Sequence, residues 1–274
     1  MSRSARILLG MLLVVALAVG AGFGLRALWD TVEDALHGDQ CTVAGYDLDP
    51  AQAEVAATMV GAVTKYSPAL PQRAAVLALA AALQESKLRN LSPGDGDRDS
   101  VGVLQQRPSQ GWGGGDAAVL NDVGEATREF LDAMVKVRDW QTRPLAVVVQ
   151  EVQISADGSA YAQHEAEARA LAEALDGSTP AAITCDFDAP TKVAAPAQVA
   201  QLLTADLPVA APAVAGRALR VPRARWQTAA WFVAYSYRLG IEEVSFGGRT
   251  WTRGDGWRQS GAGSTAVVAT LHPG

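Results

Sequence analysis

The stretch that decides the fold reads QRAAVLALAAALQESKL and runs from Gln72 to Leu88. Val76, Leu79 and Leu83 fall on one face of a helix, while alanines occupy the opposite face. A helix that is apolar all round is normally buried on all sides. We therefore predict a central buried helix whose last turn presents one carboxylate, Glu85, where the helix leaves the core.

Helices are also expected on both sides of this segment. Asp49 followed by Pro50 is a typical helix start, because Asp caps the first turn and Pro fits its first position. Apolar spacing predicts further helices at about residues 117–137, 144–155 and 159–175. Residues 90–115 are rich in Gly, Asp, Ser and Pro and are expected as loop or short strands. The pattern predicts a mainly α fold.

The N-terminal segment indicates export. Residues 7–25 contain no charge, and about 20 such residues are needed to cross a bilayer as a helix. Arg3 and Arg6 precede the stretch, and Asp30 follows it, which predicts a cytoplasmic N-terminus and an extracytoplasmic remainder. We interpret residues 1–30 as a single-pass plasma-membrane anchor, with residues 7–28 in contact with the membrane. Cleavage as a signal peptide is the alternative.

Two cysteines, Cys41 and Cys185, are the only ones in the chain. An exported chain meets oxidising conditions, in which two thiols tend to pair. A bridge between them would close a long loop, and the chain-entropy model gives such a closure about 4–5 kcal/mol. We predict this disulfide, with two unpaired thiols as the alternative.

The composition changes after Cys185. Residues 186–214 are rich in Ala and Pro and are expected to be mostly linker, with a short helix possible near residues 197–207. Residues 215–274 predict a small α+β domain: a helix at about 227–239, strands at 243–246 and 265–271, and a Gly247-Gly248 turn between two strands. Most of the tryptophans of this segment are expected in its core.

The net charge and the motifs of the chain limit which partners and ligands are expected. The net charge is −6, and no basic run is interleaved with aromatics, so nucleic acid is not an expected partner. We expect no cofactor and no metal, because the spacing of Asp95, Asp97 and Asp99 lacks the rest of a calcium loop. His164 and Glu165 are adjacent on a helix and point in different directions, so they are read as surface residues.

Glu85 is the candidate for chemistry. Cleaving a glycosidic bond requires a proton donor for the leaving oxygen, and a carboxylic acid does this best in a poorly solvated site. The end of an apolar helix, followed by a Gly-rich loop, is suited to this role. An ordinary solvated glutamate is the alternative on position alone.

The segment Ala82-Leu-Gln-Glu-Ser86, followed by Ser100-Val-Gly-Val-Leu-Gln105, resembles the soluble lytic transglycosylase and goose-type lysozyme group. The stretch GDRDSVGVLQQRPSQGWG is similar to an actinobacterial exported family with a lysozyme-like domain. The resemblance implies that residues 41–185 form an all-α lysozyme-like domain enclosed by the two cysteines. It implies a peptidoglycan glycan substrate and a lytic transglycosylase or muramidase (glycoside hydrolase) activity.

The resemblance also implies residue roles. Glu85 matches the general acid, and the other residues expected to bind the substrate are Ser86, Ser100, Gln105, Gln106, Trp112, Gln150 and Gln153. Among them Trp112 is our own suggestion, as a platform for a sugar or as a loop anchor. Gln150 and Gln153 stand where the group usually has Ala-Tyr-Asn-x-Gly. Tyr161 is a candidate to fill the space of the missing tyrosine ring, but ordinary packing against the last helix is the preferred interpretation.

The missing Tyr-Asn pair leaves a second interpretation open. The chain would then be a catalytically inactive lysozyme-like protein that binds glycan, or an envelope scaffold whose C-terminal domain contacts an envelope protein partner.

Overall fold

The computed structural model describes residues 39–155 and 157–274. Residues 39–274 form one compact unit, and the membrane anchor predicted at residues 1–30 lies outside the described residues. Within the described part, no helix is both long and apolar enough to cross a bilayer.

The prediction of a mainly α fold is wrong, because the described residues form an α+β structure with two antiparallel sheets. The smaller sheet has the order β2-β1-β3 and lies inside the segment that was expected to be all-α. Its strands are β1 (Gln40–Val43), β2 (Tyr46–Leu48) and β3 (Ile183–Asp186). Strands of three or four residues carry too little alternation to be recognised in the sequence.

The predicted disulfide is confirmed. Cys41 on β1 and Cys185 on β3 lie directly opposite each other in the small sheet and are covalently joined. Cys41 is fully buried and Cys185 nearly so. The bridge therefore belongs to the core and joins the beginning and the end of the segment predicted as one domain.

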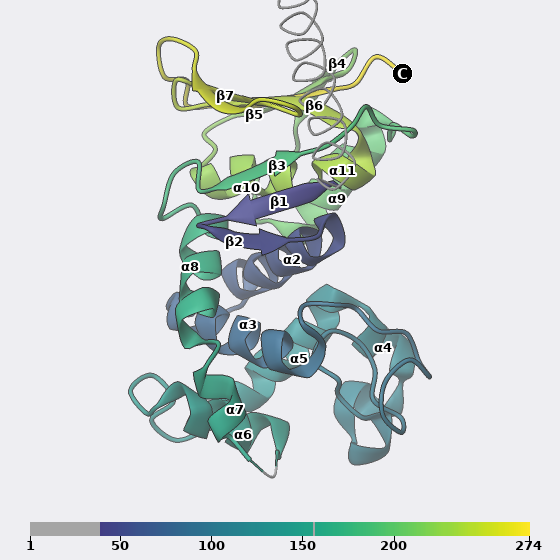
Figure 1. Cartoon of the computed structure of the whole chain (residues 1–274), viewed down its shortest axis with the longest axis vertical. Coiled ribbons are helices and arrows are strands. Elements are labelled where there is room, and N and C mark those ends of the chain that lie inside the picture. Colours follow the sequence, from purple (N-terminus) through teal and green to yellow (C-terminus); the bar gives the residue numbers. More distant parts are fainter. Residues whose placement is uncertain (1–38, 156) are drawn as a thin grey trace, which may run out of the picture. The chain divides into compact units, whose positions relative to one another are not determined.

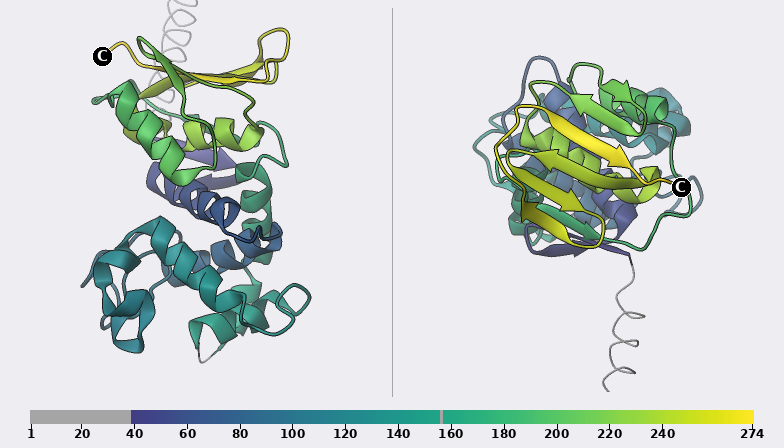
Figure 2. Two further views of the ribbon diagram at one scale, coloured as in Figure 1. Left: turned by 180° about the vertical axis from the view of Figure 1, so that it is seen from behind. Right: turned by 90° about the horizontal axis from the view of Figure 1, so that it is seen from above.

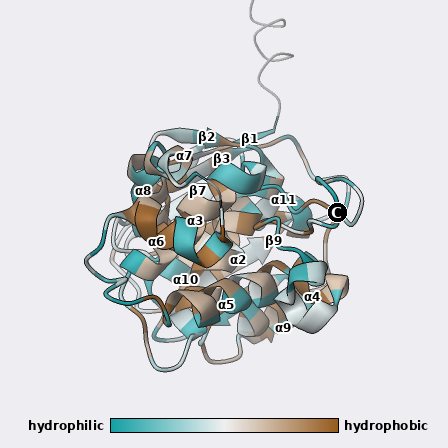
Figure 3. Cartoon of the chain, turned by 90° about the horizontal axis from the view of Figure 1, so that it is seen from below, coloured by the Kyte–Doolittle hydropathy of each residue, from teal (hydrophilic) through white to brown (hydrophobic). Residues whose placement is uncertain are grey.

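Helix α3 (Arg73–Ser86) is the predicted central helix. It lies among α2 (Pro50–Lys65), α5 (Val123–Met134), α6 (Leu145–Gln153), α7 (Ser159–Ala162) and α8 (Glu165–Leu175), as Figure 3 shows from one end of the unit. Every residue from Ala74 to Leu83 is buried. Burial on all sides follows from the small and apolar residues around its whole circumference.

Two of the predicted long helices are interrupted. Asp122 ends α4 (Ala117–Asn121) and caps α5, its carboxylate accepting a hydrogen bond from the Glu125 amide. Residues 163–164 separate α7 from α8. By contrast, α2 begins as predicted, since Asp49 and Gln52 form a capping box ahead of Pro50.

The larger sheet is formed by the C-terminal part of the chain and has the order β4-β5-β9-β6-β7-β8. Its strands are β4 (Ala213–Ala215), β5 (Ala218–Val221), β6 (Ile241–Phe246), β7 (Arg249–Thr252), β8 (Gly256–Gln259) and β9 (Val267–Leu271). The predicted Gly247-Gly248 turn joins β6 to β7. Figure 1 shows this sheet at one end of the unit, and Figure 2 shows α9 (Pro196–Asp206) and α10 (Trp226–Ala234) on one of its faces.

The segment expected as linker is part of this folded unit. Val199 and Leu203 of α9 are fully buried, and α9 contacts both α2 and β5. Helix α10, followed by α11 (Ser236–Leu239), packs against α2, α8 and β3 as well as β6. Trp231 and Trp251 are buried, as expected for core residues, and Trp226 packs edge-to-face on Phe246. One core therefore connects the helical part to the larger sheet.

Candidate functional site

Glu85 lies in the last turn of α3 and is half-buried. The hydroxyl of Tyr161, on α7, donates a hydrogen bond of 2.5 Å to Oε1 of Glu85. Tyr161 is only 2% exposed, so its ring is fixed in the core while its hydroxyl meets the carboxylate. Burial, and then the hydrogen bond to Glu85, raise the pKa of Tyr161 well above its usual range. The hydroxyl therefore stays protonated and remains a donor to Glu85.

Sequence reasoning did not assign Tyr161 to the site, because packing was preferred to the alternative that its ring fills the place of the missing tyrosine; the ring does pack in the core, and its hydroxyl also meets Glu85. Its neighbours gave no motif: the Tyr-Asn pair of the resembling group is absent, and Tyr161 comes several residues after the stretch in which that pair was sought. The one sequence feature that could have indicated a role in the site was that Tyr161 lies near the start of a predicted helix. Its distance from Glu85 depends on the tertiary fold.

Ser86 joins the end of α3 to the following loop. Its hydroxyl lies 2.7 Å from the Val103 carbonyl and 3.2 Å from the Ala82 carbonyl, and it also accepts a hydrogen bond from the Arg89 amide. Ser86 is buried, so its role in the structure is to hold the residues 100–106 segment against the helix that carries Glu85.

The segment from Ser100 to Gln106 folds into a tight irregular hairpin. Bridges pair Leu91 with Gly102 and Val101 with Gln106. Gly102 has φ +77°, and a Cβ there would collide with the Leu120 carbonyl, so this position requires glycine. The short strand predicted here is thus reduced to isolated bridges.

The two glutamines of this segment differ. The Gln105 side chain donates to the Gly102 carbonyl at 2.8 Å, and its own backbone is left-handed. Gln106 is 3% exposed, and neither atom of its amide has a hydrogen-bond partner among the described residues. Ser100 is also buried. Of the three, Gln105 alone is open to solvent in part, so it is the residue of this segment placed to meet a ligand.

Gln150 and Gln153 come from α6. Gln153 donates from Nε2 to the Leu104 carbonyl at 2.8 Å, which ties α6 to the same segment that Ser86 holds. Gln150 donates to the Ser155 carbonyl at 3.3 Å. Gln153 therefore helps α6 to hold the residues 100–106 segment in place beside Glu85.

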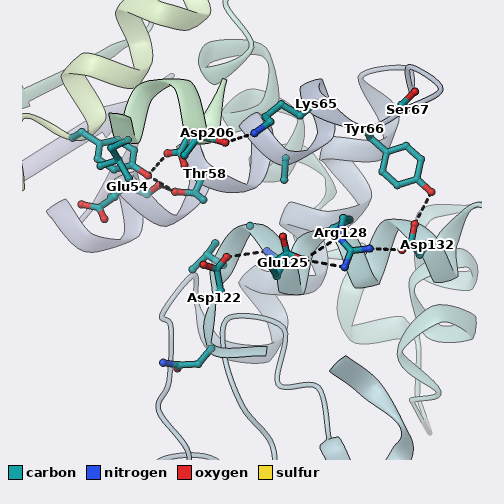
Figure 4. Close-up of a pocket in the computed structure, with 17 residues that line it drawn as sticks. Glu54, Thr58, Lys65, Tyr66, Ser67, Asp122, Glu125, Arg128, Asp132 and Asp206 are labelled. Carbon is teal, nitrogen blue, oxygen red and sulfur yellow. Dashed lines mark hydrogen bonds and ion pairs between the residues drawn. The ribbon is translucent and has the colours of Figure 1, made fainter. Parts of the chain in front are cut away.

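Trp112 lies apart from this network. It is half-buried in the short 3-10 helix η2 (Trp112–Gly115), which follows η1 (Pro108–Gln110). Its ring lines a cavity of about 410 Å³ together with Val137, Glu151 and the exposed Ile154. Glu85 lines neither this cavity nor the cavity of about 730 Å³ between α2, α5 and α9, which Figure 4 shows.

Two of the three loop aspartates, Asp95 and Asp99, are engaged in structure, and Asp97 is exposed. Asp99 accepts from Arg107 Nε at 2.6 Å and from the Ser109 amide at 2.9 Å, and these hydrogen bonds, with Ser109 contributing most, hold its pKa well below the usual range. Asp95 accepts from the Ser92 amide. No group of three or more His, Cys, Asp or Glu side chains in the described part of the chain could hold a metal ion.

The site thus gathers Glu85, Ser86 and Tyr161 with the 100–106 segment and Gln153. His164 flanks it, since its Nε2 lies 3.1 Å from Oε1 of Gln84, the residue before Glu85. His164 and Glu165 are both partly exposed. No protein-family model matches the chain, and no curated protein is similar to it in sequence.

Proposed function

We propose that this chain cleaves peptidoglycan glycan strands outside the plasma membrane, with Glu85 as the acid. The observation that carries the proposal is the 2.5 Å hydrogen bond from Tyr161 to Glu85 at the end of a buried helix. A half-buried carboxylate that is hydrogen-bonded to one fixed donor keeps one orientation. Cleavage of a glycosidic bond requires a proton donor that is oriented in this way.

The chemistry follows from one carboxylate. Glu85 gives its proton to the leaving glycosidic oxygen while the bond from that oxygen to the sugar carbon breaks. A hydroxyl of the same sugar then attacks this carbon and returns its proton to the Glu85 carboxylate, so that no water is consumed. Tyr161 donates to the ionised carboxylate between the two steps.

This route is favoured over hydrolysis because inverting hydrolysis needs a second carboxylate about 6.5–9.5 Å away as a base. Asp99, on the neighbouring loop, is already committed to Arg107 and the Ser109 amide. Intramolecular attack leaves a product that lacks one molecule of water relative to the hydrolytic product, and mass spectrometry of the released fragments distinguishes the two.

The test compares the full chain with Glu85→Gln on gels that contain peptidoglycan. Glu165→Gln is the matched control, because Glu165 lies on α8 in a solvent-accessible ion pair with Arg169. We expect clearing by the wild type and by Glu165→Gln and none by Glu85→Gln. Equal clearing by all three proteins, or none by any, would contradict cleavage by Glu85; sedimentation with peptidoglycan in the second case would indicate a binding protein without catalysis.

A further inference from the structure

The cavity of about 410 Å³ beside Trp112 lies between the ends of α5 and α6 and the short helices η1 and η2. We call it the Trp112 cavity. Its lining is largely aliphatic, because the buried side chains of Val137 and Val152 face it together with Ala133 and Ile154. The polar residues of the lining are Gln110, Lys136 and Glu151.

Exposed apolar side chains gather around the Trp112 cavity. Among the large apolar side chains that are well exposed in the described part of the chain, three lie on the two helices that bound it. They are Val135, directly after α5, and Val147 and Ile154, which are two turns apart on the same face at α6. A single exposed apolar side chain is ordinary, but a group of them beside a cavity is typical of a binding surface.

Ile154 is held at a cost to stability. It ends α6 with φ +52° and ψ +37°, a left-handed conformation that β-branched residues rarely adopt and that Gly or Asn usually supplies at a helix end. Its side chain is 72% exposed, so packing within the described residues does not repay this cost. A strained backbone that carries an exposed apolar side chain into a cavity indicates a role in binding.

Lys136 sets the charge of the Trp112 cavity. The side chain is exposed and forms no ion pair or hydrogen bond with another described residue. The other charged residue of the lining, Glu151, is paired with Arg143 at 2.9 Å. The cavity therefore has a local positive charge in a chain whose net charge is −6, and this favours a ligand that bears a carboxylate.

The Trp112 cavity adjoins the proposed active site through α6. Gln153 lies between two residues of the cavity lining, Val152 and Ile154, and donates to the Leu104 carbonyl. The segment that borders Glu85 is thus held by a residue next to the cavity. A substrate at Glu85 has this cavity as its neighbour.

We propose that the Trp112 cavity binds the peptide that peptidoglycan carries on its sugars, with Lys136 receiving a carboxylate and Ile154 contacting alanine methyl groups. This peptide combines small apolar residues with free carboxylates, which matches an aliphatic lining around one unpaired ammonium. A sugar ring fits less well, because its hydroxyls would face Val137 and Val152 without hydrogen-bond partners. The inference rests on the proposed function, since it takes peptidoglycan as the substrate.

The first test is calorimetric titration of the full chain with the free tetrapeptide L-Ala-γ-D-Glu-meso-diaminopimelyl-D-Ala. We expect saturable binding by the wild type. Lys136→Gln should weaken this binding about tenfold, because the carboxylate of the peptide loses its charged partner. Lys192→Gln is the matched control, since Lys192 is also exposed but lies outside the lining of the cavity, and it should bind as the wild type does.

The second test uses Ile154→Asn, which removes the apolar side chain and introduces a residue that tolerates the left-handed backbone. We expect the midpoint of urea denaturation to stay the same or rise, while tetrapeptide binding falls about tenfold. Changes in these directions exclude loss of fold as the cause of weak binding. Val214→Asn, at an exposed valine of β4, is the control and should leave binding unchanged.

No saturable binding of the tetrapeptide by the wild type, or equal weakening in the two control variants, would overturn the proposal. A tetramer of N-acetylglucosamine is the second probe. If Lys136→Gln and Ile154→Asn weakened binding of this tetramer and left the tetrapeptide unaffected, the cavity would be a sugar site and the proposal would fail.

The gel assay keeps this proposal separate from the proposed function. Binding of the tetrapeptide without clearing of peptidoglycan would support the peptide site and contradict cleavage by Glu85. Clearing without binding of the tetrapeptide would contradict the peptide site alone.

Discussion

Tyr161 and Glu85 are separated by 76 positions in the sequence, yet the hydroxyl of one lies 2.5 Å from the carboxylate of the other. The helix that carries Glu85 buries its alanine and leucine side chains in the core. Tyr161 is a buried residue of α7, the short helix before α8. The Tyr161 side chain cannot move far without opening the core. The relationship is therefore built into the packing of α3 and α7.

Replacing Tyr161 by Phe should separate orientation from packing. The ring stays while the donor is lost, so we expect peptidoglycan clearing to fall about tenfold and the free energy of unfolding to fall by about 1 kcal/mol. Gel clearing and urea denaturation measure the two effects. Tyr46→Phe, on strand β2, is the control. A Tyr161→Phe protein with full activity would show that the hydroxyl does not serve the proposed reaction.

Removing the disulfide should lower stability without removing the fold of the small sheet. Cys41 and Cys185 are separated by 144 positions, and for a closed loop of that length the chain-entropy model gives about 4–5 kcal/mol. We expect the Cys41→Ser, Cys185→Ser double variant to lose about that much in urea denaturation. Reduced wild type should match the variant; a loss in the variant alone would point to packing of the serines instead.

Gly102 provides a test of the hairpin beside the site. Gly102→Ala adds a Cβ against the Leu120 carbonyl at a positive φ, so we expect a loss of about 2–4 kcal/mol in unfolding free energy. Gly94→Ala is the matched control, because Gly94 also has a positive φ but nothing within 4 Å of the added carbon. It should lose only about 1 kcal/mol. Similar losses at both positions would mean that backbone strain alone is responsible.

Glu54 should make stability depend on pH. Its pKa is raised in the folded state above the usual value for a glutamate, mainly by burial, so the folded protein holds this proton more tightly than the unfolded chain. The contribution of Glu54 to stability therefore falls as the pH rises through the interval between the unfolded and folded pKa values. Below that interval the group is neutral in both states.

The corresponding variant is Glu54→Gln, which cannot ionise. Relative to the wild type it should become more stable as the pH rises from about 4 to 7, as judged by urea denaturation at several pH values. Glu165→Gln should show no comparable trend. A constant difference across this range would mean that the ion pair with Arg238 cancels the effect of burial.

The helices of the central part were predictable where the apolar pattern was continuous. Ala74 to Leu83 alternate alanines with larger residues around the whole helix, and the Asp49-Pro50 start is a local signal. The breaks at Asp122 and at residues 163–164 were not found, because the apolar spacing continues across them. Asp122 is itself a helix cap, and such a residue in the middle of an apolar pattern is the signal that was missed.

The small sheet and the closeness of Tyr161 to Glu85 could not be predicted in the same way. Both depend on segments that are far apart in sequence: β1 pairs with β3, and α7 meets the end of α3. The two cysteines were the feature of the sequence from which a contact between distant residues was predicted. The structure joins them between β1 and β3, at the two ends of the segment 41–185. The burial of Gln106 could not be predicted either, because the residues around it in the sequence show no apolar periodicity that marks this position as buried.

Because the bridge between β1 and β3 encloses residues 41–185, an external protease that cut the exposed turn around Gly94 would not release a fragment. The two pieces would migrate together until a reducing agent was added. For the extracytoplasmic role proposed above, this means that a single nick would leave both halves of the site in one molecule.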